Sequence, residues 1–285
     1  SFFLMQSLAA TLSFQGGSPS NSRVALPPLY RIALVALFLG LLGLDFSKGL
    51  AYSALAPVWA TVPIFVGLVR AFLVCGILGS VFSGKGPVPR ILLIFGAVGA
   101  MIGFLSIIAA QGWALLAVAG HAGRMGLPVV ALVMAFGLAR RPELLIYILV
   151  SLTFLGHGSY ALGWPGPRPQ LFENLVFGTI GLEASAASIF LTMVGILNLL
   201  AAVLVFVRKL AMSMLIYMVV WGLMTSLAYP WAYLEFSEEQ VGWLRWNSEF
   251  LTRLPHALLP LALLRSVVSA KRDKGSPRRL DISTL

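Results

Sequence analysis

A small set of charged and histidine side chains falls inside long apolar stretches of the sequence, and these are the residues that could do chemistry. A charged side chain in the core of a bilayer costs about 2.5–3.5 kcal/mol on insertion scales, so one that is retained there has a partner or a function. We therefore take as candidate ligand-binding residues Arg70, His121, Arg124, His157, Glu249, Arg253 and His256.

The spacing of these residues suggests shared helix faces. His121 and Arg124 are three positions apart, as are Arg253 and His256, so each pair would lie on one face of a helix. Glu249 and Arg253 are four apart and can form an ion pair. Guanidinium groups donate hydrogen bonds, and imidazoles donate, accept or relay protons. The pattern predicts a polar site in the outer half of the membrane.

Three interpretations of this site are open from the sequence. The first is a binding cavity for an anionic or quinone-like headgroup, with Arg124 and Arg253 as donors. The second is a heme b site with His121 and His157 as axial ligands. Glycines flank these histidines and would let a flat macrocycle approach: Gly120, Gly123, Gly156 and Gly158. The third is structural, with interhelical hydrogen bonds worth about 0.6 kcal/mol each.

The elements that must position these residues are membrane-spanning helices. Hydrophobic residues make up 59% of the 285 residues and charged residues 11%, and the mean hydropathy is +0.93. Soluble proteins have about 25% charged residues, and disordered chains have low hydrophobicity, so both classes are excluded. A span needs about 20 apolar residues. Such runs lie near 30–48, 57–82, 91–110, 113–138, 143–163, 185–207, 210–233 and 247–270.

Basic residues are distributed unequally between the two sides of this predicted eight-helix bundle. One side has only Lys48, Arg168 and Arg245. The other has Arg23, Arg31, Lys85, Arg90, Arg140, Arg141, Arg208, Lys209, Arg265, Lys271, Arg272, Lys274, Arg278 and Arg279. Basic loops stay in the cytoplasm, so both termini are predicted to be cytoplasmic. The net charge of +10 is thus explained by these loops, without a nucleic-acid partner.

The two halves of the chain resemble each other, which predicts a tandem repeat of a four-helix unit. Residues 1–22 would form an N-terminal interfacial segment, 23–141 the first unit, 142–270 the second and 271–285 a basic tail. Chance similarity between Leu/Gly-rich helices is the alternative. The matched segments are Phe38-Leu39-Gly40 with Phe154-Leu155-Gly156, Ile64-Phe65 with Ile189-Phe190, Gly103-Phe104-Leu105 with Gly222-Leu223-Met224, Gly112-Trp113 with Gly242-Trp243, and His121-x-x-Arg124-x-x-Leu127-Pro128 with Arg253-x-x-His256-x-x-Leu259-Pro260.

The ends of this unit resemble the DoxX-like family of bacterial integral membrane proteins. The opening helix carries Tyr30-Arg31-Ile32-Ala33 and then Lys48-Gly49, and the closing helix carries Glu249-x-x-x-Arg253 followed by Leu259-Pro260-Leu261. That family usually has four helices, so each half would match it separately. The resemblance implies a location in the bacterial cytoplasmic membrane and a redox-linked or accessory role.

The leading prediction for function is a non-catalytic accessory subunit of a larger, redox-linked bacterial membrane complex. No Gly-rich phosphate loop, HExxH, GxSxG or EF-hand pattern occurs in the sequence. Its partners would be membrane lipid and other membrane subunits. The alternatives are a transporter or binding protein for a small molecule or lipid, and a heme b electron-transfer protein. Quinone and heme b are therefore the cofactors to consider.

Overall fold

The computed structural model describes residues 26–48, 62–83, 86–110, 114–139, 142–164, 166–233 and 240–275. These residues fold into helices and, over the same ranges, contain no strand. The helices are α2 (Pro28–Lys48), α3 (Val62–Val81), α4 (Pro87–Ala110), α5 (Leu115–Ala135), α6 (Glu143–Leu162), α7 (Gln170–Ile180), α8 (Ala184–Leu204), α9 (Ala211–Ala232), α10 (Gln240–Arg253) and α11 (Pro255–Gly275).

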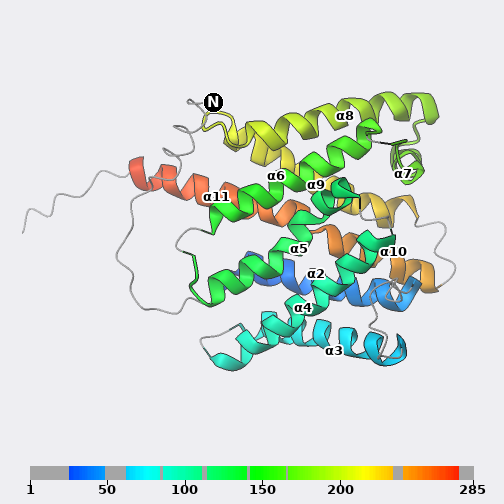
Figure 1. The fold of residues 1–285 in the computed structure, drawn as a ribbon. Helices are drawn as coiled ribbons and strands as arrows, with labels where there is room; N and C mark the ends of the chain where they lie inside the picture. The colour runs from blue at the N-terminus through cyan, green and yellow to red at the C-terminus, as the bar shows by residue number, and fades with distance from the viewer. Residues whose placement is uncertain are drawn as a thin grey trace, which may run out of the picture.

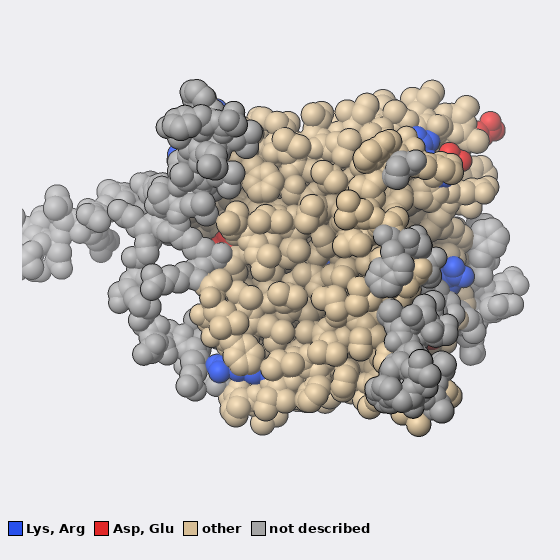
Figure 2. All heavy atoms as spheres, in the orientation of Figure 1, with Lys and Arg blue, Asp and Glu red and all other residues tan. Residues whose placement is uncertain are grey.

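The protein is an all-α, polytopic membrane bundle, as the apolar runs predicted. Eight segments of the described chain are long and apolar enough to cross a bilayer, with α10 and α11 together supplying the eighth, Gly242–Ala270. The helices run roughly side by side (Figure 1). On the face seen in Figure 2, charged side chains gather toward the two ends, and the band between them is uncharged. This is the surface that a lipid environment requires.

The structure departs from the expected helix plan in two places. Helix α7 (Gln170–Ile180) occupies the segment expected to be a loop, at the end of the bundle where α6 ends and α8 begins. We call this end the α7 end; it is the predicted outer side. The last span is broken at Leu254, between α10 and α11, because Pro255 has no N–H for the helix ladder. The chain is therefore interrupted at Pro255, whereas α5 and α11 continue through Pro128 and Pro260.

Several expectations lie outside the described residues or at their edge. The predicted interfacial segment 1–22 is among the residues that the structure does not describe. Most of the predicted tail, 271–285, also lies outside the described residues, and α11 continues through its first part to Gly275.

Glycines bring α3 and α4 into close contact in the first half of the bundle. A Cβ added to Gly76 would lie 2.8 Å from the Cα of Gly96, and one added to Gly79 would lie 2.8 Å from the backbone nitrogen of Leu93. Only glycine, whose side chain is a hydrogen atom, permits the two helices to approach this closely. Phe38 of α2 packs beside both Gly76 and Gly96, so three helices meet here in the buried core.

The corresponding pair in the second half, α8 and α9, is separated. Helix α7 packs against both of them, and α8 and α9 contact each other only sparsely. Helix α8 packs instead on α6, and α9 on α10 and α11. The second half of the bundle therefore contains a space walled by α6, α7, α8 and α9.

Candidate functional site

Six of the seven candidate residues come together, and a tyrosine joins them. We call this group the histidine–arginine cluster. His121 and Arg124 come from α5, His157 from α6, Glu249 and Arg253 from α10, and His256 from α11; the added residue is Tyr229 of α9. His121, Arg124, Tyr229 and His256 are all at least nine-tenths buried. Side chains from five helices thus form one polar centre within an apolar bundle.

The α5 part of the cluster is held by a local hydrogen bond and by an aromatic ring. The guanidinium of Arg124 is hydrogen-bonded to Nδ1 of His121, one helical turn earlier. The same guanidinium lies 5.5 Å from the ring centre of Phe104, a cation–π arrangement. Nε of Arg124 is buried and has no hydrogen-bond partner. The arginine is therefore positioned, but its hydrogen-bonding capacity is not fully used.

The α10 part contains the single acid of the cluster. Arg253 lies 3.6 Å from the carboxylate of Glu249 one turn earlier, as the spacing predicted. Its guanidinium also lies 4.1 Å from the ring centre of Tyr229. Nε of Arg253 and the hydroxyl of Tyr229 are buried without partners. Glu249 thus orients Arg253 while leaving donors available.

The break at Leu254 lies beside these residues. Because Pro255 starts α11, the helix has a new N-terminus within the membrane span, with His256 in its first turn. Gly222 of α9 lets this joint pack closely, since a Cβ there would lie 2.6 Å from the carbonyl oxygen of His256. Non-helical backbone at membrane depth is tolerated where it lines a cavity or is buried in protein. The joint therefore delivers Arg253 and His256 to the same place.

His157 and His256 face each other. Their ring centres are 5.0 Å apart in an edge-on arrangement, and Nε2 of each is buried with no hydrogen-bond partner. Thr153, one turn before His157 on α6, accepts a 2.8 Å hydrogen bond from the backbone N–H of Gly123. This bond fixes α6 against α5 at the level of the cluster.

The packing of α5 against α6 does not fit a heme between His121 and His157. Gly156 is in backbone contact with Gly120, and the ring of His157 rests against Gly120, where an added Cβ would be 3.8 Å from Cε1. The two helices therefore leave no space for a macrocycle at this level. Nor do the described residues contain any group of three or more His, Cys, Asp and Glu side chains that could hold a metal ion.

A cavity of about 390 Å³ begins at the cluster and extends between α6, α7, α8 and α9. This volume is within the range of about 300–1,000 Å³ that is usual for small-molecule pockets. Its polar end is formed by His157, Tyr229, Arg253 and His256, and Asn198 is a further polar group. The apolar wall includes Phe154, Phe172, Leu175, Val176, Phe190, Leu191, Val194, Trp221 and Trp231. Apart from Asn198 and the hydroxyls of Thr153, Thr179 and Thr225, which also line it, the cavity is thus polar at the cluster end and apolar along its length.

The cavity reaches the lipid-facing surface of the bundle. Met224 and Leu227 of α9 and Ile180 of α7 line it, and each also has an exposed side chain on the apolar outside of the protein. A molecule dissolved in the bilayer could therefore enter sideways, with its apolar part remaining in contact with lipid.

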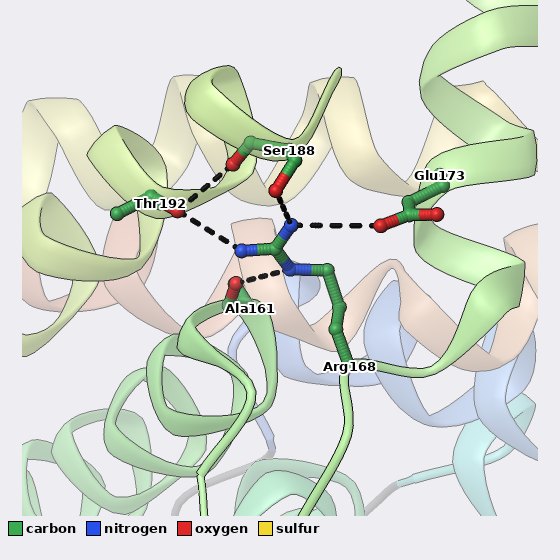
Figure 3. A network of polar contacts seen from close by, with 5 residues as sticks. All are labelled: Ala161, Arg168, Glu173, Ser188 and Thr192. Carbon is green, nitrogen blue, oxygen red and sulfur yellow. Dashed lines mark hydrogen bonds and ion pairs between the residues drawn. The ribbon is translucent and has the colours of Figure 1, made fainter. Parts of the chain in front are cut away.

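Arg168 fixes the helix that covers the cavity (Figure 3). Its Nε donates to the carbonyl of Ala161 at 2.6 Å, and its two terminal nitrogens donate to Ser188 at 2.8 Å and Thr192 at 3.0 Å. Glu173 of α7 lies 3.6 Å away. One guanidinium thereby connects the end of α6, the first turns of α8 and the start of α7.

Arg70 lies outside the cluster. Its Nε is 2.5 Å from the buried carboxylate of Asp45 on α2, and its guanidinium is 4.3 Å from the ring centre of Phe46. The structure shows the ion pair, in the other half of the bundle, so Arg70 is not part of this site.

Sequence reasoning missed three residues that matter here. Asn198 accepts a 2.8 Å hydrogen bond from Tyr217 and lines the cavity; a lone Asn in an apolar run was the available signal. Tyr229 was missed because a tyrosine near a helix end reads as an interface residue. Arg168 was counted only as an exposed loop charge, because nothing local indicates that it folds back onto α8.

Comparisons with known proteins identify no match for this chain. The chain matches no protein-family model, and no curated protein or solved structure matches it significantly.

Proposed function

We propose that this protein binds an amphipathic small molecule or lipid within the membrane. The observation that carries the proposal is the cavity of about 390 Å³, with apolar walls and the unpaired groups of His157, Tyr229, Arg253 and His256 at one end. Buried polar groups in native proteins nearly always have partners, so unpaired ones at the end of a cavity favour a ligand that supplies them.

The arrangement supports a definite pose. The polar head of the ligand lies against the cluster, where α10 and α11 meet, and its apolar body lies between α7, α8 and α9. Entry is from the bilayer, between the exposed cavity residues of α7 and α9. This is the binding and transport alternative of the sequence interpretation; the accessory-subunit role and the DoxX-like relationship stay predictions.

The test is to fill the cavity and measure binding. Val194 of α8 lines the cavity, so Val194→Trp removes space for a ligand. Val203 of the same helix has 62% of its surface exposed, so Val203→Trp is a matched control that leaves the cavity open. The probes are five amphiphiles with ten-carbon chains: decyl phosphate, decanoate, decanol, decyltrimethylammonium and decylubiquinone.

We expect at least one probe to raise the thermal unfolding midpoint of the wild type and of Val203→Trp in lipid nanodiscs, but not that of Val194→Trp. A ligand that binds only the folded state stabilises it by an amount that grows with the ratio of its concentration to Kd. If no probe distinguishes Val194→Trp from Val203→Trp, the cavity is not a binding site and the proposal fails.

A further inference from the structure

The charges of the histidine–arginine cluster do not balance among the described residues. Arg124 and Arg253 each carry one positive charge, and Glu249, 3.6 Å from Arg253, is the one carboxylate of the cluster. The imidazoles of the cluster can be neutral or positive but never negative. The cluster therefore carries a net charge of at least one positive unit at membrane depth, where an uncompensated charge is expensive.

The unsatisfied hydrogen-bonding atoms of the cluster likewise favour a ligand that accepts hydrogen bonds. Nε of Arg124 and Nε of Arg253 are both buried without partners, and an arginine nitrogen can only donate. The hydroxyl of Tyr229 and Nε2 of His157 and His256 can each donate in one of their forms. The cluster therefore lacks acceptors, and a ligand that supplies several acceptor oxygens would complete it.

The backbone at the start of α11 also favours a negatively charged group at the cluster. α11 begins at Pro255 beside the cluster, and the N-terminus of a helix has a partial positive charge. Broken membrane helices present such ends to anionic groups of their ligands. His256 lies in this first turn and lines the cavity, so the charge deficit, the free donors and the helix end coincide.

We propose that the ligand is an anionic amphiphile, with a phosphate or carboxylate head held by Arg253, His256, His157 and Tyr229 and with Arg124 supplying long-range charge from behind them. This inference rests on the proposed function, because it assigns the chemical class of the molecule that the cavity takes. A quinone could accept the hydrogen bonds but would leave the charge unbalanced, so the charge is the property that discriminates between the two classes.

The experiment compares headgroups on the same chain length, using the five probes in nanodiscs and Trp221, in the cavity wall, as a fluorescence reporter. Decyl phosphate and decanoate are expected to bind at least tenfold more tightly than decanol, decyltrimethylammonium and decylubiquinone. Whichever of the two anions binds more tightly tells a phosphate head from a carboxylate. Equal or tighter binding of decanol or decylubiquinone, blocked by Val194→Trp, would keep the cavity but overturn the anionic head.

Variants of Arg253 provide a second measurement. Arg253→Gln should weaken the binding of the anionic probes at least tenfold and leave the binding of decanol unchanged. Arg253→Lys, which keeps the charge, should reduce the affinity for the anionic probes by less. Arg245→Gln is the control, because Arg245 is an exposed arginine of the same helix. If Arg253→Gln is unfolded, the headgroup comparison on the wild type decides the question by itself. If no probe binds in a manner blocked by Val194→Trp, the proposed function itself fails.

Discussion

At the scale of single residues, Asp45 and Arg70 show how charge is retained in this bundle without serving the cavity. The carboxylate of Asp45 has 2% of its side-chain surface exposed, whereas Arg70 has 38%. Asp45 therefore depends on Arg70 to compensate its charge more than Arg70 depends on Asp45. Asp45 is almost fully buried, and Arg70 has a long side chain that can extend along the surface.

This asymmetry predicts unequal effects of the two single substitutions. Arg70→Leu should lower the free energy of unfolding by about 3 kcal/mol, because it leaves a buried carboxylate uncompensated. Asp45→Leu should cost less, because the guanidinium can reorient toward the membrane interface. The double variant should recover most of the loss, since apolar replacement of a whole buried pair is close to neutral.

Unfolding by SDS titration in mixed micelles measures all three variants. Equal losses for the two single variants, or an additive loss in the double variant, would contradict the assigned ion pair. The cluster residues should respond differently, with changes in probe binding that exceed their changes in stability.

At the scale of elements, α7 is the helix that turns an interhelical gap into a cavity. Its buried residues Leu175 and Val176 face the cavity, and its start is tied to α6 and α8 through Arg168. Arg168 makes three hydrogen bonds, each worth about 1 kcal/mol, more where a charge is involved. Helix α7 has only 11 residues and is too short to be stable alone.

Arg168→Gln should therefore loosen α7 without unfolding the bundle. We expect amide hydrogen exchange of residues 170–180 to accelerate at least tenfold, which corresponds to about 1.4 kcal/mol. Exchange in α3 should not change. Arg245→Gln, which removes an exposed arginine at the same end of the bundle, is the control. Unchanged exchange in α7 would mean that its packing on α9, and not Arg168, holds it in place.

At the scale of the whole molecule, two close approaches between helices occur at positions that the predicted repeat matches to each other. A Cβ at Gly40 of α2 would collide with the backbone nitrogen of Thr252, and one at Gly156 of α6 with the backbone nitrogen of Gly120. The matched sequence segments place Gly40 opposite Gly156 and Thr252 opposite Gly120. Corresponding residues thus make corresponding contacts, although the common origin of the two halves stays a prediction.

The halves differ where the cavity lies. In the register of the matched segments, Gly76 corresponds to Ala201 and Gly96 to Leu215. Two glycines that allow α3 and α4 to touch are therefore replaced by larger side chains in α8 and α9. Both replacements are buried in the core, so the second pair of helices is kept further apart.

The predicted orientation of the whole bundle can be tested through its single cysteine, Cys75. In a Cys75→Ser background, Ser185→Cys at the α7 end should react with a membrane-impermeant maleimide in intact cells. Ser269→Cys near the end of α11 should react only after permeabilisation, because the basic loops predict that this end is cytoplasmic. Both serines are exposed, so access alone does not separate them. The reverse labelling pattern would invert the predicted topology.

The sequence by itself determined the class of the protein, the approximate positions of its spans, and the histidines and arginines that form the cluster. Hydrophobicity along one helix is a local property, so Arg124 and His157 stand out wherever the helices pack. Helix i,i+3 and i,i+4 pairs such as Glu249 with Arg253 are local for the same reason, and the structure confirms that contact.

Only the tertiary structure decided which of these residues share a site. His157 and His256 are distant in sequence, and their facing rings depend on how α6, α9 and the α10–α11 joint pack. The cavity depends on side-chain volumes at helix contacts and on α7, whose short and weakly apolar sequence resembles a loop. The physical reason is that distances between helices are set jointly by many residues on different elements, and no single segment carries that information.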